Sequence, residues 1–251
     1  MKHVQLWLYT AWFQFLIRYR KTMLGPVWLL VGPALFIIFL GQLYAHIGST
    51  PREAFIPHLT IGLVTWTLIS GFVISSTTVF QHAKAQILQG GLKIGDIVMV
   101  NVISTILQFA HQLVLIAIVF VVFGLSVSWY AMVSLVGLAL LIANGIWLTN
   151  VFGIIGARYR DLFEVMQAIM RIAFLATPIL WMPGEGSRGG VMAAFLIYNP
   201  FYHFLELVRA PLLGQPIAPL SWLVVLSITL VGFVLAWLFR RHFSRNIALW
   251  V

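Results

Sequence analysis

The chain contains 251 residues, of which 61% are hydrophobic and only 8% are charged, so little of it could form a separate soluble domain. A formal net charge of +9 would suggest nucleic-acid binding in a soluble protein, but the basic residues flank long apolar runs, where membrane orientation and anionic lipid headgroups account for them. We therefore expect no nucleic-acid partner, and the absence of cysteine excludes disulfides, iron–sulfur clusters and thiolate zinc sites.

The first predicted element is a helix over residues 4–17, which is apolar but too short to span a membrane. A set of its apolar residues falls near one helical face: Val4, Leu8, Ala11, Trp12 and Phe15. This pattern predicts an amphipathic helix that lies among membrane lipids in the cytoplasmic interface; a flexible arm is the alternative. Gly25-Pro26 then breaks the helix, and Pro26 suits the first turn of the next one.

Six apolar runs follow, each about as long as the roughly 20 residues that a helix needs to cross a bilayer. They cover residues 28–46, 59–80, 101–125, 129–157, 166–182 and 220–239. The sequence therefore predicts an all-α polytopic membrane protein with six transmembrane helices, in which residues 1–251 form a single transmembrane domain.

The segments between the runs contain three short predicted helices. Ala83–Gln89, stopped by Gly90-Gly91, lies between the second and third runs and could dock a soluble partner or be an ordinary loop. Val191–Tyr198 and Phe201–Leu213, separated by the helix-capping pair Asn199-Pro200, lie between the fifth and sixth runs. Both are too short to span and apolar enough to re-enter the membrane where protein covers them.

The charges give the orientation. If the segments between the runs alternate between compartments, twelve of the fifteen Lys and Arg residues fall on one side. By the positive-inside rule that side is cytoplasmic, so we expect both termini in the cytoplasm. The three exceptions are Arg52, Arg188 and Arg209.

Residues that could carry catalysis are scarce. The stretch nearest to a phosphate-binding loop, Gly90–Gly95, lacks the required spacing and hydroxyl residue, so ATP cannot be bound in that way. None of the six carboxylates lies deep in a predicted span, which argues against an ion-coupled carrier and an enzyme with paired carboxylates. His203 and Glu206 alone are too few to predict a metal site. These absences argue against an enzyme and against a cofactor bound by the chain itself.

Polar and aromatic residues inside the runs allow two interpretations. Gln108, His111 and Gln112 recur at helical spacing in the third run, where they form either interhelical hydrogen bonds or a polar stripe along a solute path. Aromatic residues make up 14% of the chain. They suit packing and membrane interfaces, and they would also suit a conduit for sugars, whose apolar faces stack on rings.

Four segments together resemble the type-two ATP-binding-cassette exporters, in the branch that moves lipid-linked polysaccharides such as O-antigen, capsule and teichoic acid. The segments span nearly the whole chain and are Arg18–Trp28, Gly156–Leu162, Ala176–Trp181 and Asn199–Gly214. The tail from Arg245 to Trp250 also looks like that of O-antigen members.

The resemblance implies a homodimer in the bacterial inner membrane that works with two separate ATPase subunits, which bind ATP and magnesium. It also implies a polyprenyl-diphosphate-linked glycan as substrate, without specifying the sugar. Residues 2–22 would be an interface helix, and residues 191–213 would supply gate helices at the outer exit. The coupling helix that contacts the ATPase would consist of Ala83, Lys84, Ala85, Gln86, Ile87, Leu88 and Gln89.

The remaining implied sites follow the same substrate path. Leu24 and Gly25 would narrow the cytoplasmic entrance, where the basic group Arg18, Arg20 and Lys21 could attract the lipid pyrophosphate or simply set the orientation. The channel would be lined by the first, second and fifth spans, with the aromatic candidates Trp28, Tyr44, Trp66, Phe174 and Trp181. The outer gate would include Asn199, Pro200, His203, Glu206 and Arg209.

Two rival classes compete with an ATP-driven exporter. An ATP-independent lipid-glycan flippase or secondary carrier would work without a partner, and His111 is its only ionisable candidate in the middle of a span. A membrane glycosyltransferase would need acidic residues near the membrane face, and Asp161 and Glu164 are too few to support that function.

Overall fold

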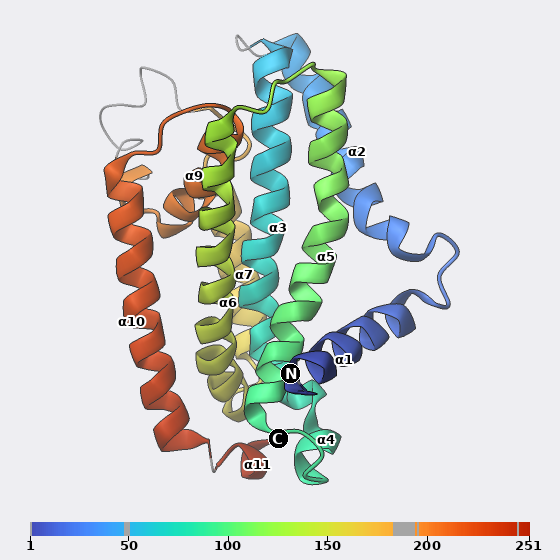
Figure 1. Cartoon of the computed structure of the whole chain (residues 1–251), viewed down its shortest axis with the longest axis vertical. Helices are drawn as coiled ribbons and strands as arrows, with labels where there is room; N and C mark the ends of the chain where they lie inside the picture. Colours follow the sequence, from blue (N-terminus) through green and yellow to red (C-terminus); the bar gives the residue numbers. More distant parts are fainter. Residues whose placement is uncertain (1, 48–50, 183–193, 195, 245) are drawn as a thin grey trace.

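The computed structural model describes residues 2–47, 51–182, 194, 196–244 and 246–251, and within them it contains helices and no strands (Figure 1). The all-α prediction is therefore confirmed. Two short 3-10 turns, Gly25–Val27 and Trp129–Met132, precede α2 and α6. The helices are α1 (Lys2–Tyr19), α2 (Trp28–Ile47), α3 (Arg52–His82), α4 (Lys84–Leu88), α5 (Ile94–Val122), α6 (Val133–Arg158), α7 (Leu162–Ala176), α9 (Pro200–Leu212), α10 (Pro219–Phe243) and α11 (Ile247–Trp250).

Among the described residues, five helices are long and apolar enough to cross a membrane: α2, α3, α5, α6 with its preceding turn, and α10. The fifth predicted run, residues 166–182, is wrong in its extent, because α7 begins at Leu162 and ends at Ala176. Its 15 residues, rising about 1.5 Å each, make a helix about 22 Å long, which is short of the ~30 Å hydrocarbon core. Thr177 precedes a proline and is extended, with ψ 138°, which stops the helix.

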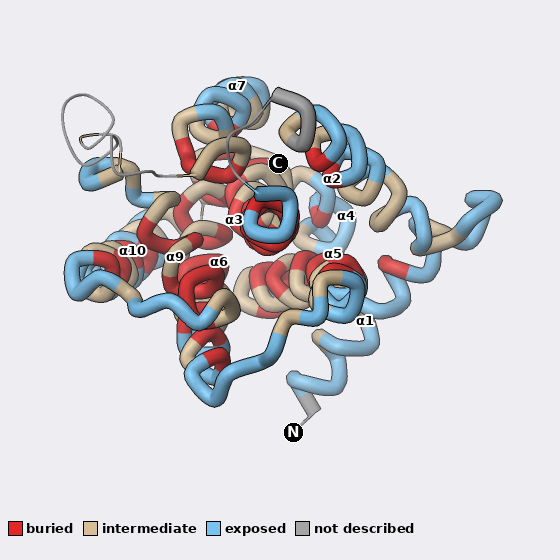
Figure 2. Tube along the Cα trace, turned by 90° about the horizontal axis from the view of Figure 1, so that it is seen from above, coloured by how far each residue is buried: buried red, intermediate tan, exposed pale blue. Residues whose placement is uncertain are grey.

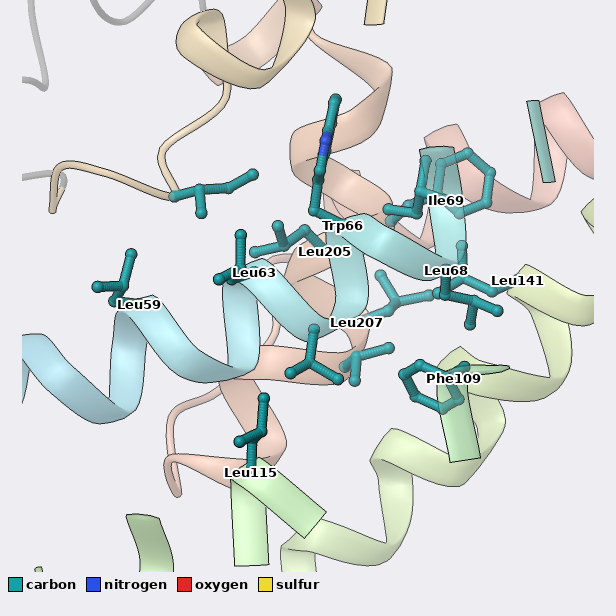
Figure 3. Close-up of a cluster of buried hydrophobic side chains, with 14 of the residues drawn as sticks. Leu59, Leu63, Trp66, Leu68, Ile69, Phe109, Leu115, Leu141, Leu205 and Leu207 are labelled. Carbon is teal, nitrogen blue, oxygen red and sulfur yellow. The ribbon is translucent and has the colours of Figure 1, made fainter. Parts of the chain in front are cut away.

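Helix α3 lies at the centre of the bundle, with α2, α5, α6, α7 and α9 around it (Figure 2). Every residue from Phe55 to Trp66 is buried, as expected for a helix that other helices surround. Its side chains Leu63, Trp66 and Leu68 meet α9 through Leu205 and Leu207 (Figure 3). The core therefore surrounds α3 instead of lying between layers.

Among the described glycines, the one with the least space lies between the cytoplasmic halves of α3 and α6. A Cβ added at Gly156 would lie 1.9 Å from the carbonyl oxygen of Thr77, so no other residue fits without moving one helix. The amide of Gln81 donates to the carbonyl of Gly156 at 2.6 Å. Gly156 belongs to one of the segments that carry the family resemblance, and this contact is the physical reason for a glycine there.

Both termini, α4 and α11 lie at one end of the bundle (Figure 1). The sequence predicts that all of them are cytoplasmic, and we refer to this as the cytoplasmic end. The opposite end contains the N-terminal half of α3, the end of α5 and the loop that leads to α6. We refer to it as the outer end.

Helix α1 runs crosswise to the long helices and packs on the lower half of α5 (Figure 1). The indole of Trp7 donates to Asp96 at 2.8 Å, which ties it to the start of α5. Ala11 and Phe15 are buried, but the other predicted members of the apolar face, Val4, Leu8 and Trp12, are exposed. Further apolar residues are exposed on the opposite side, so α1 is not divided into one apolar and one polar face as predicted. One apolar stripe packs on α5 and the rest is left for lipid or a partner.

Candidate functional site

Two adjoining hollows lie against α3 on the side facing α2 and α5. The first, which we name the aromatic groove, lies between α2, α3 and α7 and has a volume of about 820 Å³. It is lined by Gly32, Pro33, Phe36, Leu63, Trp66, Met170, Arg171 and Phe174, among others. The second, which we name the polar cavity, lies between α1, α3, α4 and α5 and has a volume of about 860 Å³. Ser70 and Ile74 line both, so the two hollows meet on α3.

Three rings from three helices form the wall of the aromatic groove. The ring centroid of Phe174 lies 5.7 Å from that of Trp66 and 6.2 Å from that of Phe36. Trp66 also meets Phe201 of α9 edge-on at 5.4 Å, so α9 supports it from behind. These separations are typical of aromatic pairs, and the rings, with interplanar angles of 51° and 53°, give the groove an aromatic wall.

Two of the five aromatic residues that the sequence predicts along a channel line this groove, and their role in a channel stays a prediction. Trp66 and Phe174 line the groove, whereas Trp28, Tyr44 and Trp181 do not. Tyr44 stacks on Phe55 at 4.1 Å, and Trp28 is 51% exposed at the start of α2. The groove also contains Phe36, which sequence reasoning missed because an apolar run does not indicate which of its many aromatic residues faces α7.

The polar cavity has a different chemistry. Hydroxyl and amide side chains cover much of its wall: Thr67, Ser70, Ser75, Thr78, Asn101, Ser104, Gln108 and Gln112. The only residues with ionisable side chains among those lining it are Arg18 of α1 and His82 of α3, and none carries a carboxylate. The hydroxyl of Ser104 is buried and has no hydrogen-bond partner among the described residues. The cavity can therefore accept water, hydroxyl groups or an anion, and it disfavours a cation.

The cavity also resolves the polar stripe of α5. Gln108 and Gln112 line it, and Gln112 accepts a hydrogen bond from Thr67 of α3. His111 does not line it. Its ring lies 4.8 Å from Phe15 of α1, and Nδ1 lies 2.7 Å from the carbonyl oxygen of Leu107. The stripe thus combines interhelical packing with a cavity wall.

The predicted entrance residues are close in sequence and separate in space. Arg18 lines the polar cavity, whereas Arg20 and Lys21 are exposed outside it. Leu24 is also exposed, and Gly25 has a φ of +56°, a left-handed value that favours glycine. The loop between α1 and α2 can therefore turn sharply at Gly25.

The predicted coupling helix is present as α4, one residue shorter at each end than the predicted range. Lys84, Ala85, Gln86, Leu88 and Gln89 are exposed, Ile87 is half-buried, and Ala83 is buried at the start. Gly90, with a φ of +68°, ends the helix, and the amide of Gly91 donates to the carbonyl of Gln86 at 3.0 Å. Most of α4 is thus a free cytoplasmic surface.

A buried polar network occupies the outer half of the bundle. Arg209 of α9 is only 3% exposed and forms an ion pair with Glu206. Its Nη1 lies 2.9 Å from Nε2 of His58 on α3 and donates to the carbonyl of Pro178, after α7, at 2.5 Å. This group, Arg209, Glu206, His58 and the Pro178 carbonyl, is named the outer lock, because it joins α9 to two other elements.

The other predicted gate residues have structural partners as well. Asn199 caps α9 by accepting from the amide of Phe201 at 3.0 Å and donates to the hydroxyl of Thr177 at 2.9 Å, and Pro200 is the first residue of the helix. His203 contacts the hydroxyl of Ser221 at 3.0 Å and the carbonyl of Ile197 at 2.9 Å. Half of the predicted helix 191–198, residues 191–193 and 195, lies outside the described residues.

Burial, helped by the nearby Glu206 carboxylate, raises the pKa of Tyr202 to about 12, so this phenol stays neutral. His203 and Glu206 are not joined by a third ligand: the described residues contain no cluster of three or more side chains suited to a metal. In the described part of the outer end, these polar side chains therefore serve packing and hydrogen bonding.

Comparison with known proteins gives consistent matches. The family model described as ABC-2 type transporter matches residues 5–213. An O-antigen export system permease protein RfbA from Myxococcus xanthus is 20% identical over 193 residues, covering 77% of this chain and 74% of the relative. The protein of the same description from Klebsiella pneumoniae is 26% identical over 171 residues, covering 66% of this chain and 64% of the relative.

Proposed function

Because the chain belongs to the ABC-2 type transporter family, we propose that it is the channel-forming permease subunit of an ATP-driven exporter. The substrate is a lipid-linked polysaccharide of the O-antigen type, as the descriptions of the two relatives suggest. The glycan, attached to polyprenyl diphosphate, moves from the cytoplasm outward across the bacterial inner membrane. Two copies of the chain form the channel, and two ATPase subunits drive it.

The aromatic groove carries this proposal. A glycan conduit must hold sugars loosely, so that each unit binds and then moves on. Rings suit this task because stacking does not depend on a fixed pattern of hydrogen bonds. Phe36, Trp66 and Phe174 form such a surface on α2, α3 and α7, the same three segments that the family resemblance places along the channel.

The energy must come from a second protein, because the chain has no phosphate-binding loop. Helix α4 is the expected contact, since it is exposed at the cytoplasmic end and leads directly into α5. The polar cavity reaches from Gln86 of α4 to Gln112 near the middle of α5, so it runs alongside the elements that a bound ATPase would move. The guanidinium of Arg18 at this cavity can attract the lipid pyrophosphate.

A secondary carrier is the rival function, and the structure supports it less well. An ion-coupled carrier keeps an ionisable group on its solute path. His111 was the one ionisable candidate in the middle of a span. Its ring packs against Phe15 of α1 and does not line the polar cavity. Replacing His111 by Gln should therefore leave export intact, whereas a carrier that relied on this group would lose it.

Co-purification tests the proposal directly. The tagged chain is expressed in its own host, extracted in a mild detergent and purified, and the proteins that accompany it are identified. We expect an ATP-hydrolysing subunit in equal amount, and a permease dimer in native mass spectrometry. A chain that is monomeric and purifies without an ATPase, yet still supports export, would contradict the proposal.

A further inference from the structure

The C-terminal helix α11 packs against the cytoplasmic end of the bundle next to α4. Ile247 is completely buried there, in an apolar cluster with Ala83, Val79, Ile97 and Ile154. Ile87, the half-buried residue of α4, packs on the same cluster. The family model matches this chain only as far as residue 213, so that match assigns no role to α11.

The other end of α11 is held by rings. The ring centroid of Trp250 lies 5.9 Å from that of Phe243 at the end of α10. The guanidinium carbon of Arg158, at the end of α6, lies 5.2 Å from the same Trp250 ring. Cation–π and aromatic contacts of this kind stabilise partly exposed segments. Helix α11 is thus fixed to α6 and α10 at Trp250, and its buried Ile247 is held toward α4.

Helix α4 cannot hold its own orientation. It has five residues, none of them buried and no side-chain hydrogen bond at its N-cap. Helices this short are unstable in isolation. Ala83 before α4 and Ile87 within it are its anchors in the apolar cluster, so the cluster determines where the exposed face of α4 points.

We infer that α11 is a positioning element for the coupling helix: Ile247 completes the apolar seat of α4, and α4 then presents its exposed residues to the ATPase subunit. The inference rests on the proposed function for the identity of that partner. The seat itself is a property of this chain and can be tested without the partner. Ile247 is a positioning residue, because it acts through α4 and does not reach the cytoplasmic surface.

Amide hydrogen exchange across residues 83–93 is the first readout. In the full chain in detergent, Ile247→Ala should speed exchange in this segment roughly tenfold, because α4 separates from the apolar cluster more often when the packing of the cluster is weakened. Ile247→Val should restore protection. Val225→Ala removes a comparably buried side chain from the outer half of α10, and it should leave exchange in residues 83–93 unchanged.

Retention of the ATPase subunit during purification is the second readout. Ile247→Ala should reduce the retained amount about fivefold, within the range by which residues that touch neither ligand change coupling between sites. Leu249, which is 82% exposed on the same helix, provides the matched control. Leu249→Ser should retain the partner as well as the wild-type chain does.

Two results would overturn the inference. If Ile247→Ala and Val225→Ala have the same effect on residues 83–93, then Ile247 is only a core residue. If Leu249→Ser alone releases the ATPase and exchange is unchanged, then α11 is a direct contact and not a support. Failure of the wild-type chain to retain any ATPase would instead contradict the proposed function, and the exchange data would still decide the role of α11.

Discussion

The outer half of the bundle and its cytoplasmic end treat their basic side chains in opposite ways. In the outer half, Arg209 and His203 are buried and hydrogen-bonded to protein groups. At the cytoplasmic end, Arg18, Arg20 and Lys84 are exposed, and none of them forms an ion pair within the described residues. Water and lipid headgroups solvate these cations, and a partner can reach them.

The difference indicates which end can change shape at little energetic cost. A buried charge that loses its partner is strongly destabilising, whereas an exposed ion pair contributes little. The outer lock therefore keeps α3, α9 and the end of α7 together as one unit. In the proposed exporter, an exit at this end would open by moving this unit or by exchanging its hydrogen bonds. The cytoplasmic surface can instead be rearranged by whatever binds it.

The sharpest test of this comparison removes the cation of the outer lock. Arg209→Ala leaves the Glu206 carboxylate without its ion-pair partner, so it should lower the free energy of unfolding by about 3–5 kcal/mol. The measurement is thermal or denaturant unfolding of the purified chain in detergent, followed by tryptophan fluorescence. Arg20→Ala at the cytoplasmic end is the control and should change the midpoint very little. Equal losses in the two variants would show that the two ends do not differ.

The second prediction tests whether the helices of the cytoplasmic half are weakly packed throughout or only at their surface. The contact between Gly156 and Thr77 lies in that half and leaves less space than at any other described glycine. Gly156→Ala should therefore destabilise the chain by about 1–3 kcal/mol through overpacking. Gly32 of α2 has no atom within 4 Å of an added Cβ, so Gly32→Ala should be neutral or stabilise the helix by about 0.5–1 kcal/mol.

Unfolding measurements on this pair of alanine variants give a clear answer. A harmless Gly156→Ala would mean that α3 and α6 separate easily and that looseness extends into the bundle. A costly one would confine the mobile part to α1, α4 and the α1–α2 loop.

The sequence predicts the helices well and their ends less well. Runs of about 20 apolar residues are a strong signal because a bilayer requires internally hydrogen-bonded helices of that length, and α2, α3, α5, α6 and α10 follow it. The error in the fifth run arose because hydropathy measures how apolar a segment is and carries no information on the backbone conformation that its residues favour. Pro178 carried the missing signal, since the residue before a proline disfavours the helical conformation.

The site was harder to predict, because its parts are far apart in the chain. His58 and Arg209 are 151 positions apart, and Trp7 and Asp96 are 89 apart. Sequence spacing places residues on a helical face but does not reveal which helix lies opposite. The same limit explains why Trp28 was grouped with the groove residues and Phe36 was not.

The third prediction concerns the aromatic groove. Phe36 lines the aromatic groove and Phe39, on the same helix, does not. Phe36→Leu keeps an apolar side chain and removes the ring, so stacking worth about 0.5–1.5 kcal/mol is lost, which corresponds to an export rate roughly 2- to 10-fold lower. Phe39→Leu should export normally. The amount of polysaccharide that reaches the outer surface is measured at equal levels of permease in the membrane.

This comparison separates the conduit from the membrane-facing surface. If the two leucine variants export equally, the rings of the groove contribute packing alone, and the path for sugars must lie elsewhere.

The smallest expected effect belongs to the cytoplasmic cations. Arg18 lines the polar cavity and Arg20 does not, so Arg18→Gln should reduce export while Arg20→Gln should not. Because Arg18 is exposed, the reduction should be modest, up to about fivefold, and salt should diminish it. Export into inside-out vesicles at low and high ionic strength measures both properties. A loss that is equal for the two variants would assign these arginines to membrane orientation, whereas a salt-sensitive loss confined to Arg18→Gln would place an anionic group of the substrate in the cavity.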